Sequence, residues 1–215
     1  MPTINLFKYL SSNFLTFDEL IKISSSSQEL IEDLIDKKKM PKASYTLHLN
    51  SQCHSFFGEN HTQESILFFA KGYTYWLGLL QNKTFDAKQY FKQEYIHELS
   101  ELEKIFGAIE MEKYSVSLNA HLEQEWEHFL AGIYGLCTRS GLPREIARKE
   151  YAIDKIKKLT DDGKQLVLNT GDKQELSRAI KLLDEVSALF AHHEIDKSSR
   201  EKYINVMRKQ YGLAG

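Results

Sequence analysis

Apolar residues recur at helical spacing along most of this 215-residue chain and predict a mainly α fold. The apolar stripes run through Leu122, Trp126, Phe129, Leu130, Ile133 and Cys137, through Phe91, Tyr95, Leu99, Leu102 and Phe106, and through Leu176, Ala179, Ile180, Leu183, Val186 and Phe190. Residues 64–80 are apolar on all sides, which predicts a central buried helix. Strand patterns are few. Tyr45, Leu47 and Leu49 alternate with polar residues, and residues 53–57 are expected to return as their hairpin partner.

The segment 13–49 has the layout of two short helices followed by a strand. A Ser-rich turn separates the helices, and capping-box spacing starts them at Thr16 with Glu19 and at Ser26 with Glu29. This layout resembles a winged helix-turn-helix of the mercury-resistance-regulator or excisionase type, in which two short helices precede a β wing. We therefore expect a helix-turn-helix with a small β wing over residues 1–61, packed on a multi-helix body over residues 62–215.

The resemblance suggests DNA binding, but the charges of the second helix oppose it. Base edges require hydrogen-bond donors near the start of that helix, and phosphates require cations. In this chain those roles would fall to Ser25, Ser26, Ser27, Gln28 and Lys42. The same helix carries Glu29, Glu32, Asp33 and Asp36, and carboxylates that face phosphates weaken binding. A DNA-binding transcriptional regulator is therefore an alternative and not the leading prediction.

The composition narrows the class of protein. Hydrophobic residues make up 42% and charged residues 27%, which is typical of globular proteins. Cys53 and Cys137 are the only cysteines, so a disulfide framework is not expected. No apolar run approaches the roughly 18 residues of a membrane span, and no signal peptide is indicated, so we expect a cytoplasmic protein without membrane contact. Because no nucleotide-binding loop or nucleophile elbow occurs, no cofactor is predicted and a non-catalytic protein is favoured.

The net charge of −2 hides an asymmetry along the chain. Residues 1–60 carry 6 Lys/Arg against 7 Asp/Glu, residues 61–136 carry 6 against 11, and residues 137–215 carry 16 against 12, so the net charges are −1, −5 and +4. The acidic middle and the basic end are expected to attract each other within one fold or between two copies.

One face of the helix predicted from Pro143 to about Thr160 is basic. It carries Arg144, Arg148, Tyr151, Lys155 and Lys158, opposite Ile153 and Ile156. Four cations around an aromatic ring can bind an anion or an acidic surface, although such a face is usually only solvated. We predict that a protein partner or a second copy of the chain binds there.

A Glu-x-x-His motif occurs on two predicted helices, as Glu94 with His97 and as Glu125 with His128. Paired motifs of this kind hold two metal ions in ferritin-like bundles, provided that they project into the bundle core. At 100° per residue, both histidines fall away from the apolar stripes of their helices. A helical-bundle enzyme with a dimetal carboxylate site is therefore a second alternative.

Three further segments resemble an uncharacterised bacterial family labelled "natural product biosynthesis protein". They are residues 40–45 (MPKASY), residues 134–139 (YGLCTR), and residues 191–194 (AHHE) followed by 198–200 (SSR). The resemblance implies a bacterial origin and an accessory place beside secondary-metabolite enzymes, and it implies no catalytic residue. The leading prediction is accordingly an accessory or binding protein.

Overall fold

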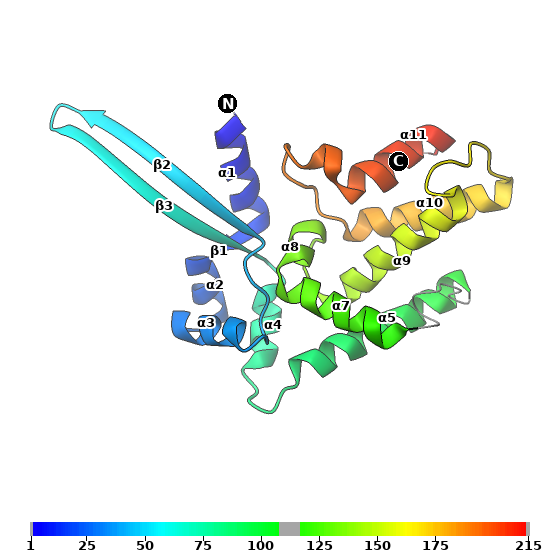
Figure 1. The fold of residues 1–215 in the computed structure, drawn as a ribbon, viewed down its shortest axis with the longest axis horizontal. Helices are drawn as coiled ribbons and strands as arrows, with labels where there is room; N and C mark the ends of the chain where they lie inside the picture. Colours follow the sequence, from blue (N-terminus) through cyan, green and yellow to red (C-terminus); the bar gives the residue numbers. More distant parts are fainter. Residues whose placement is uncertain (1, 108–116, 214–215) are drawn as a thin grey trace.

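The computed structural model describes residues 2–107 and 117–213 and is mainly helical, with one small antiparallel sheet (Figure 1). The first elements are α1 (Pro2–Asn13), β1 (Phe14–Thr16), α2 (Phe17–Ser24), α3 (Gln28–Asp36), β2 (Tyr45–Ser55) and β3 (Gly58–Ala70). The helical elements that follow are α4 (Tyr73–Leu80), α5 (Ala87–Phe106), α7 (Leu118–Leu130), α8 (Ile133–Cys137), α9 (Pro143–Thr160), α10 (Thr170–Val186), η1 (Ile195–Lys197), η2 (Glu201–Asn205) and α11 (Val206–Tyr211). None of the described helices is long and apolar enough to cross a membrane.

Side-chain caps determine where the two short helices α2 and α3 begin. Thr16 and Glu19 form a complete capping box at the start of α2, as the spacing predicts. Helix α3 starts one residue later than expected, because the Ser27 side chain accepts a hydrogen bond from the backbone N–H of Leu30 at 3.2 Å. Ser25 ends α2 in the left-handed conformation, with φ of 52°. The expected order of two helices and a hairpin is therefore present, while its identity as a winged helix-turn-helix stays a prediction.

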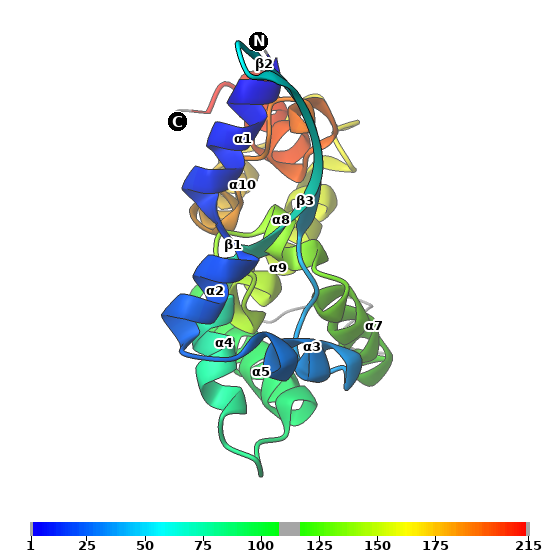
Figure 2. The ribbon, with the colours of Figure 1, turned by 90° about the vertical axis from the view of Figure 1, so that its left-hand side faces the viewer.

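The sheet has the strand order β1-β3-β2, and its hairpin is longer than the sequence predicts. β2 pairs with β3 from Tyr45 opposite Phe68 to Ser55 opposite Gly58, whereas β1 pairs only with the base of β3. The expected helix over residues 64–80 is wrong in its first half, because residues up to Ala70 belong to β3. A short buried apolar run carries no period that separates strand from helix. The hairpin projects away from the helices (Figure 1), and α1 lies along its base (Figure 2).

One hydrophobic core joins the N-terminal elements to the helical body. It contains Leu20 of α2 and Ile31 of α3 together with Trp76 of α4 and Phe129 of α7. The rings of Trp76 and Phe129 meet edge to face with centroids 4.8 Å apart. The indole of Trp76 also donates a hydrogen bond to the backbone carbonyl of Lys39 at 2.8 Å. The division into regions 1–61 and 62–215 stays a prediction. Residues of both regions belong to this core.

Helix α9 lies between two cores, in the middle of the body (Figure 1). Ala147 and Tyr151 belong to the core shared with α4, α5 and α7, whereas Ile153 and Ile156 belong to a second core with α10 and α11. Pro143 occupies the first turn of α9, as expected. Both long sides of this helix are therefore covered.

Candidate functional site

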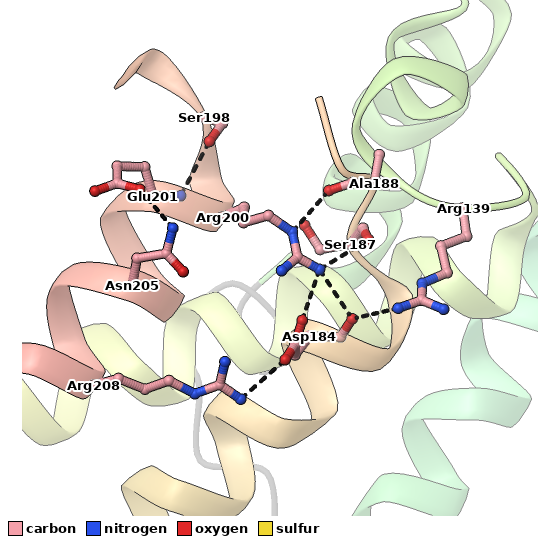
Figure 3. A network of polar contacts seen from close by, with 9 residues as sticks. All are labelled: Arg139, Asp184, Ser187, Ala188, Ser198, Arg200, Glu201, Asn205 and Arg208. Carbon is pink, nitrogen blue, oxygen red and sulfur yellow. Dashed lines mark hydrogen bonds and ion pairs between the residues drawn. The ribbon is translucent and has the colours of Figure 1, made fainter. Parts of the chain in front are cut away.

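Three arginines surround the C-terminal end of α10 (Figure 3). Helices end with backbone carbonyls that have no partner within the helix, and cations are favourable at this end of the helix dipole. The Arg139 guanidinium donates a hydrogen bond to the backbone carbonyl of Asp184 at 3.1 Å. Arg200 donates through Nε to the carbonyl of Ala188 at 3.0 Å. The last turn of α10 and the segment after it are thus held by side chains from two distant parts of the chain.

The carboxylate of Asp184 lies between two of these arginines. It is 2.6 Å from Arg200 Nη2 and 2.9 Å from Arg208 Nη2. Partial burial alone would raise the pKa of Asp184, but the hydrogen bonds from Arg208 and Arg200 outweigh it and hold the pKa below its usual range. Charge-assisted hydrogen bonds of this kind are stronger than neutral ones. The Asp184 side chain therefore links α10 to η2 and α11.

A cavity of 530 Å³ opens beside this cluster. One face of α10 lines it, at the positions i, i+3, i+4, i+7 and i+8 that share a helix side: Ser177, Ile180, Lys181, Asp184 and Glu185. Arg139, Arg208 and Leu213 complete the lining. The charge of Asp184 is balanced by its two arginines. The other charged residues of the lining, apart from Arg208, are the cations Arg139 and Lys181 and the acid Glu185. The arrangement can bind a small anion against an apolar wall.

A family match covers the arginine cluster and nearly all of the cavity. The family model described as "Family of unknown function (DUF6058)" matches residues 87–212, which is more than half of the chain. The chain belongs to this family. Comparison with curated proteins and with solved structures finds no match. The DUF6058 part extends from α5 to α11 and therefore contains the arginine cluster and nearly all of the cavity, whereas the sheet and α1–α4 precede it.

A second polar cluster is buried inside the DUF6058 part. Glu125 of α7 is 4% exposed and accepts a hydrogen bond from the hydroxyl of Tyr134 in α8. His121 Nδ1 lies 3.6 Å from the same carboxylate, and His121 Nε2 is 2.9 Å from the hydroxyl of Tyr95 in α5. Burial, followed by the nearby carboxylates, raises the pKa of Tyr134. The chain of contacts ties α5, α7 and α8 together within the core.

The carboxylates of the predicted dimetal site have other partners in the part of the chain that the structure describes, so metal binding by this site stays a prediction. Glu94 is bound by Arg144, with Nε 2.6 Å from Oε2, and Glu125 is bound by Tyr134. His97 is exposed on α5, and the ring of His128 lies against Tyr134 with centroids 6.3 Å apart. Within residues 2–107 and 117–213, no three His, Cys, Asp or Glu side chains are grouped so that they could hold a metal ion. The carboxylates that the motif requires are used by cations and hydroxyls of the fold.

The basic face expected on α9 is not one exposed surface. Tyr151 is 2% exposed and packs on Phe106, and burial raises its pKa to about 12. The sequence predicts that Arg148 points away from the core, on the side opposite Ile153 and Ile156. In the structure its Nε lies 2.6 Å from the buried Glu98, which is 2% exposed.

Two more cations of this face also meet acidic residues of neighbouring helices. Arg144 is bound to Glu94 on α5, and Lys155 Nζ lies 3.5 Å from Glu175 on α10. Lys158 is exposed. The pairs Arg144–Glu94 and Arg148–Glu98 thus join the basic end of the chain to its acidic middle within the fold. A partner for these side chains stays a prediction.

The residues expected to contact DNA are used in part by the fold itself. Ser25 and Ser27 cap α2 and α3, Ser26 is half-buried between them, and the Gln28 amide donates to Glu32 at 2.9 Å. Lys42 is exposed, and its backbone N–H donates to the carbonyl of Leu130 at 2.9 Å. From Tyr45 to Ala70 the hairpin contains no Lys or Arg, so the expected wing offers no such side chain to a phosphate. Binding of DNA by these residues stays a prediction.

Sequence reasoning missed the arginine cluster altogether. Arg139, Arg200 and Arg208 lie far apart along the chain, and no spacing rule joins them to Asp184. The one available signal was indirect: Arg139 and Arg200 end two of the segments that carry the natural-product resemblance. That resemblance marked the residues without stating a role for them.

Proposed function

We propose that this member of the DUF6058 family is a non-catalytic accessory protein that binds a small anionic molecule in the cavity beside α10. The observation that carries the proposal is the convergence of Arg139, Lys181 and Arg208 on one cavity. Its volume of 530 Å³ lies within the range of small-molecule sites, about 300–1,000 Å³.

The lining favours a ligand with an acidic group and an apolar body. Guanidinium groups match the geometry of carboxylates and phosphates, and Lys181 adds a flexible point charge. Ile180 and Leu213 offer apolar surface to the rest of the ligand. Arg208 is already held by Asp184, so we assign the first contact with the anion to Arg139 and Lys181.

The test is ligand-induced thermal stabilisation of the full chain with two probes, inorganic phosphate and benzoate. A ligand that binds only the folded state stabilises it by about 1.4 kcal/mol at ten times its Kd. We expect a rise in Tm with the wild type and none with Lys181→Glu or with Arg139→Gln. Lys173→Glu is the matched control, because Lys173 is an exposed lysine on the same helix that does not line the cavity.

The two probes separate the two parts of the site. Benzoate is expected to bind more tightly than phosphate, because it adds apolar contact with Ile180 and Leu213. If neither probe stabilises the wild type, or if Lys181→Glu responds as Lys173→Glu does, the cavity is only a surface depression and the proposal fails.

We place this binding protein beside the enzymes of natural product biosynthesis. The support is the resemblance of residues 40–45, 134–139 and 191–200, which includes Arg139 and Arg200 of the arginine cluster. In such a place the chain would receive an acidic intermediate or present it to a protein partner. Recovery of biosynthetic enzymes with a tagged chain from the native bacterium, lost with Lys181→Glu, would agree with this role.

A second candidate function is DNA binding by the N-terminal region. Its support is the order β1, α2, α3, β2, β3 with strand order β1-β3-β2, and the three-residue turn between α2 and α3. Against it stand the exposed acidic residues of α3, which are Glu29, Glu32, Asp33 and Asp36.

The DNA hypothesis has a direct test in gel-shift assays with genomic fragments. Binding should weaken steeply as salt rises, and Lys42→Glu should weaken it further, because cations that release counterions supply the affinity. Lys22→Glu is a control of equal charge on α2. No shift at low salt with micromolar protein would exclude this function.

A further inference from the structure

The outer part of the β2–β3 hairpin is not covered by any other part of the described chain. Residues 50–61 are all exposed, and at the turn Phe56 is 96% and Phe57 95% exposed. The ribbon projects from the body over this length (Figure 1). An isolated two-stranded hairpin is marginally stable in water, so a long one of this kind gains from a third strand.

The open edge of this ribbon belongs to β2. In the strand order β1-β3-β2, β2 has β3 on one side only. Ser55 and Gly58 flank the two-residue turn, and such a turn is closed by a hydrogen-bonded pair. Because bonded and unbonded positions alternate, the odd-numbered residues of β2 bond to β3. The backbone groups of residues 46, 48, 50, 52 and 54 therefore point toward the open edge.

This edge lacks the devices that usually prevent strand pairing. Natural edge strands are protected by charged side chains, by proline, by bulges or by being short. β2 spans Tyr45–Ser55, contains no Lys, Arg, Asp, Glu or Pro, and keeps a constant register with β3 along its length. The opposite edge differs, because β3 carries Glu59 and Glu64 and its base is already paired with β1.

We propose that two copies of this chain associate through their β2 edges, antiparallel and about a two-fold axis at Asn50. The five outward-facing residues are symmetric about Asn50, so this register engages all of them. Thr46 then lies opposite His54 of the second copy, His48 opposite Gln52, and Asn50 opposite Asn50. No like charges face each other, which is why a second copy fits this edge. Closed two-fold pairs are also the commonest protein assemblies.

The same register gives the exposed turn a place. In this register the turn of Phe56 and Phe57 lies at the end of the second copy's β2, near its Ser44 and Ala43. These residues precede β2 and lie on the body, Ala43 beside Gly132 and Ser44 beside Gly135 of α8. The two most exposed aromatic rings of the described chain would thus meet the other copy instead of water.

Analytical ultracentrifugation of the full chain tests the association. We expect a dimer at micromolar concentration whose mass does not change between low and physiological salt, because no charged pair forms at the edge. Asn50→Pro should give a folded monomer with an unchanged far-UV circular dichroism spectrum, since the amide at residue 50 does not bond to β3 and only bonds across the edge are lost. Asn50→Thr, which keeps that amide, is the matched control and should remain a dimer.

Crosslinking tests the register. In a Cys53→Ser background, two cysteines introduced by Asn50→Cys should lie one strand spacing apart and be joined by bismaleimidoethane. Gln63→Cys in the same background is the control, because Gln63 pairs with Asn50 on β3 and two copies of it would be separated by three spacings, about 14 Å. A monomeric wild type, a dimer that survives Asn50→Pro, or equal crosslinking of the two variants would overturn the proposal.

Discussion

At the scale of single residues, the buried carboxylate of Glu125 depends on hydrogen bonds from its neighbours. A buried acceptor that loses its donor costs about 1–3 kcal/mol, because its desolvation is no longer compensated. Tyr134→Phe removes the hydroxyl that donates to Glu125 and should lower the free energy of unfolding by that amount in urea denaturation. Tyr75→Phe is the matched control. Tyr75 is 55% exposed and contacts the hydroxyl of Tyr90 at 3.1 Å, so its loss should change stability by less than about 0.5 kcal/mol. Equal effects of the two variants would contradict the buried network.

Asp184 predicts a pH dependence of stability. Its pKa is lowered in the folded chain, so its contribution is complete above the unfolded value of about 3.9 and is lost as pH falls through the folded value. Asp184→Asn should therefore cost roughly 1–3 kcal/mol at neutral pH and progressively less below about pH 4. Urea denaturation of both proteins across this range measures the difference. Glu185→Gln, at the next position of α10 and on the same cavity, is the matched control and should cost less than Asp184→Asn at neutral pH, because Arg200 and Arg208 are bound to Asp184. A constant gap for Asp184→Asn would show that the carboxylate charge does not matter.

At the scale of elements, Gly132 joins the segment before β2 to the body. It has φ of 80°, and a Cβ there would lie 2.7 Å from the Lys42 carbonyl oxygen. Gly132→Ala should cost about 2 kcal/mol or more, because a left-handed backbone alone costs an alanine about 1–2 kcal/mol and the clash adds to it. Gly78→Ala is the matched control. Gly78 is exposed in α4 with open space around it, so the same substitution should gain roughly 0.5–1 kcal/mol there. Thermal denaturation that moves both variants in the same direction would contradict this account.

Elements were predictable from the sequence where one periodicity dominated. The stripe around Phe91 became α5, and Thr16 and Pro143 started helices as expected. The stripe around Trp126 is divided between α7 and α8 at the left-handed Gly132, and the stripe around Leu176 is helical only as far as Val186, so that Phe190 lies beyond α10. The segment 64–70 was not predictable. It is a strand because it pairs with β2, and its own pattern of apolar residues does not distinguish a strand from a helix. The basic face of α9 was misjudged for a related reason. A helical projection identifies a face but not the helix that packs on it, and here α5 and α10 supply the acids. The arginine cluster is formed by three segments that are distant along the chain, so it could be found only once the fold was known.

At the scale of the whole molecule, α9 couples the two cores. The first core holds both tryptophans, whose rings lie 6.4 Å apart, and it reaches from α2 to α9. The second core contains the other side of α9 with α10 and α11. Unfolding either core alone would strip one side of α9, so the two are expected to unfold together. Tryptophan fluorescence reports on the first core, and far-UV circular dichroism reports on all helices. The two signals should therefore give one coincident transition in urea.

Core truncations make this prediction quantitative. Ile31→Ala removes a fully buried side chain from the first core, and Leu176→Ala does the same in the second. Each should cost about 2–5 kcal/mol, and each should shift the fluorescence and dichroism transitions by the same amount. If Leu176→Ala lowers the dichroism midpoint while the fluorescence midpoint stays in place, the cores are independent. In that case the packing of α9 would not couple them, and the C-terminal helices would act as a separate unit carrying the arginine cluster. A single shifted transition for both variants would instead mean that a ligand in the cavity beside α10 stabilises the N-terminal elements as well, since binding to a cooperative fold stabilises all of it.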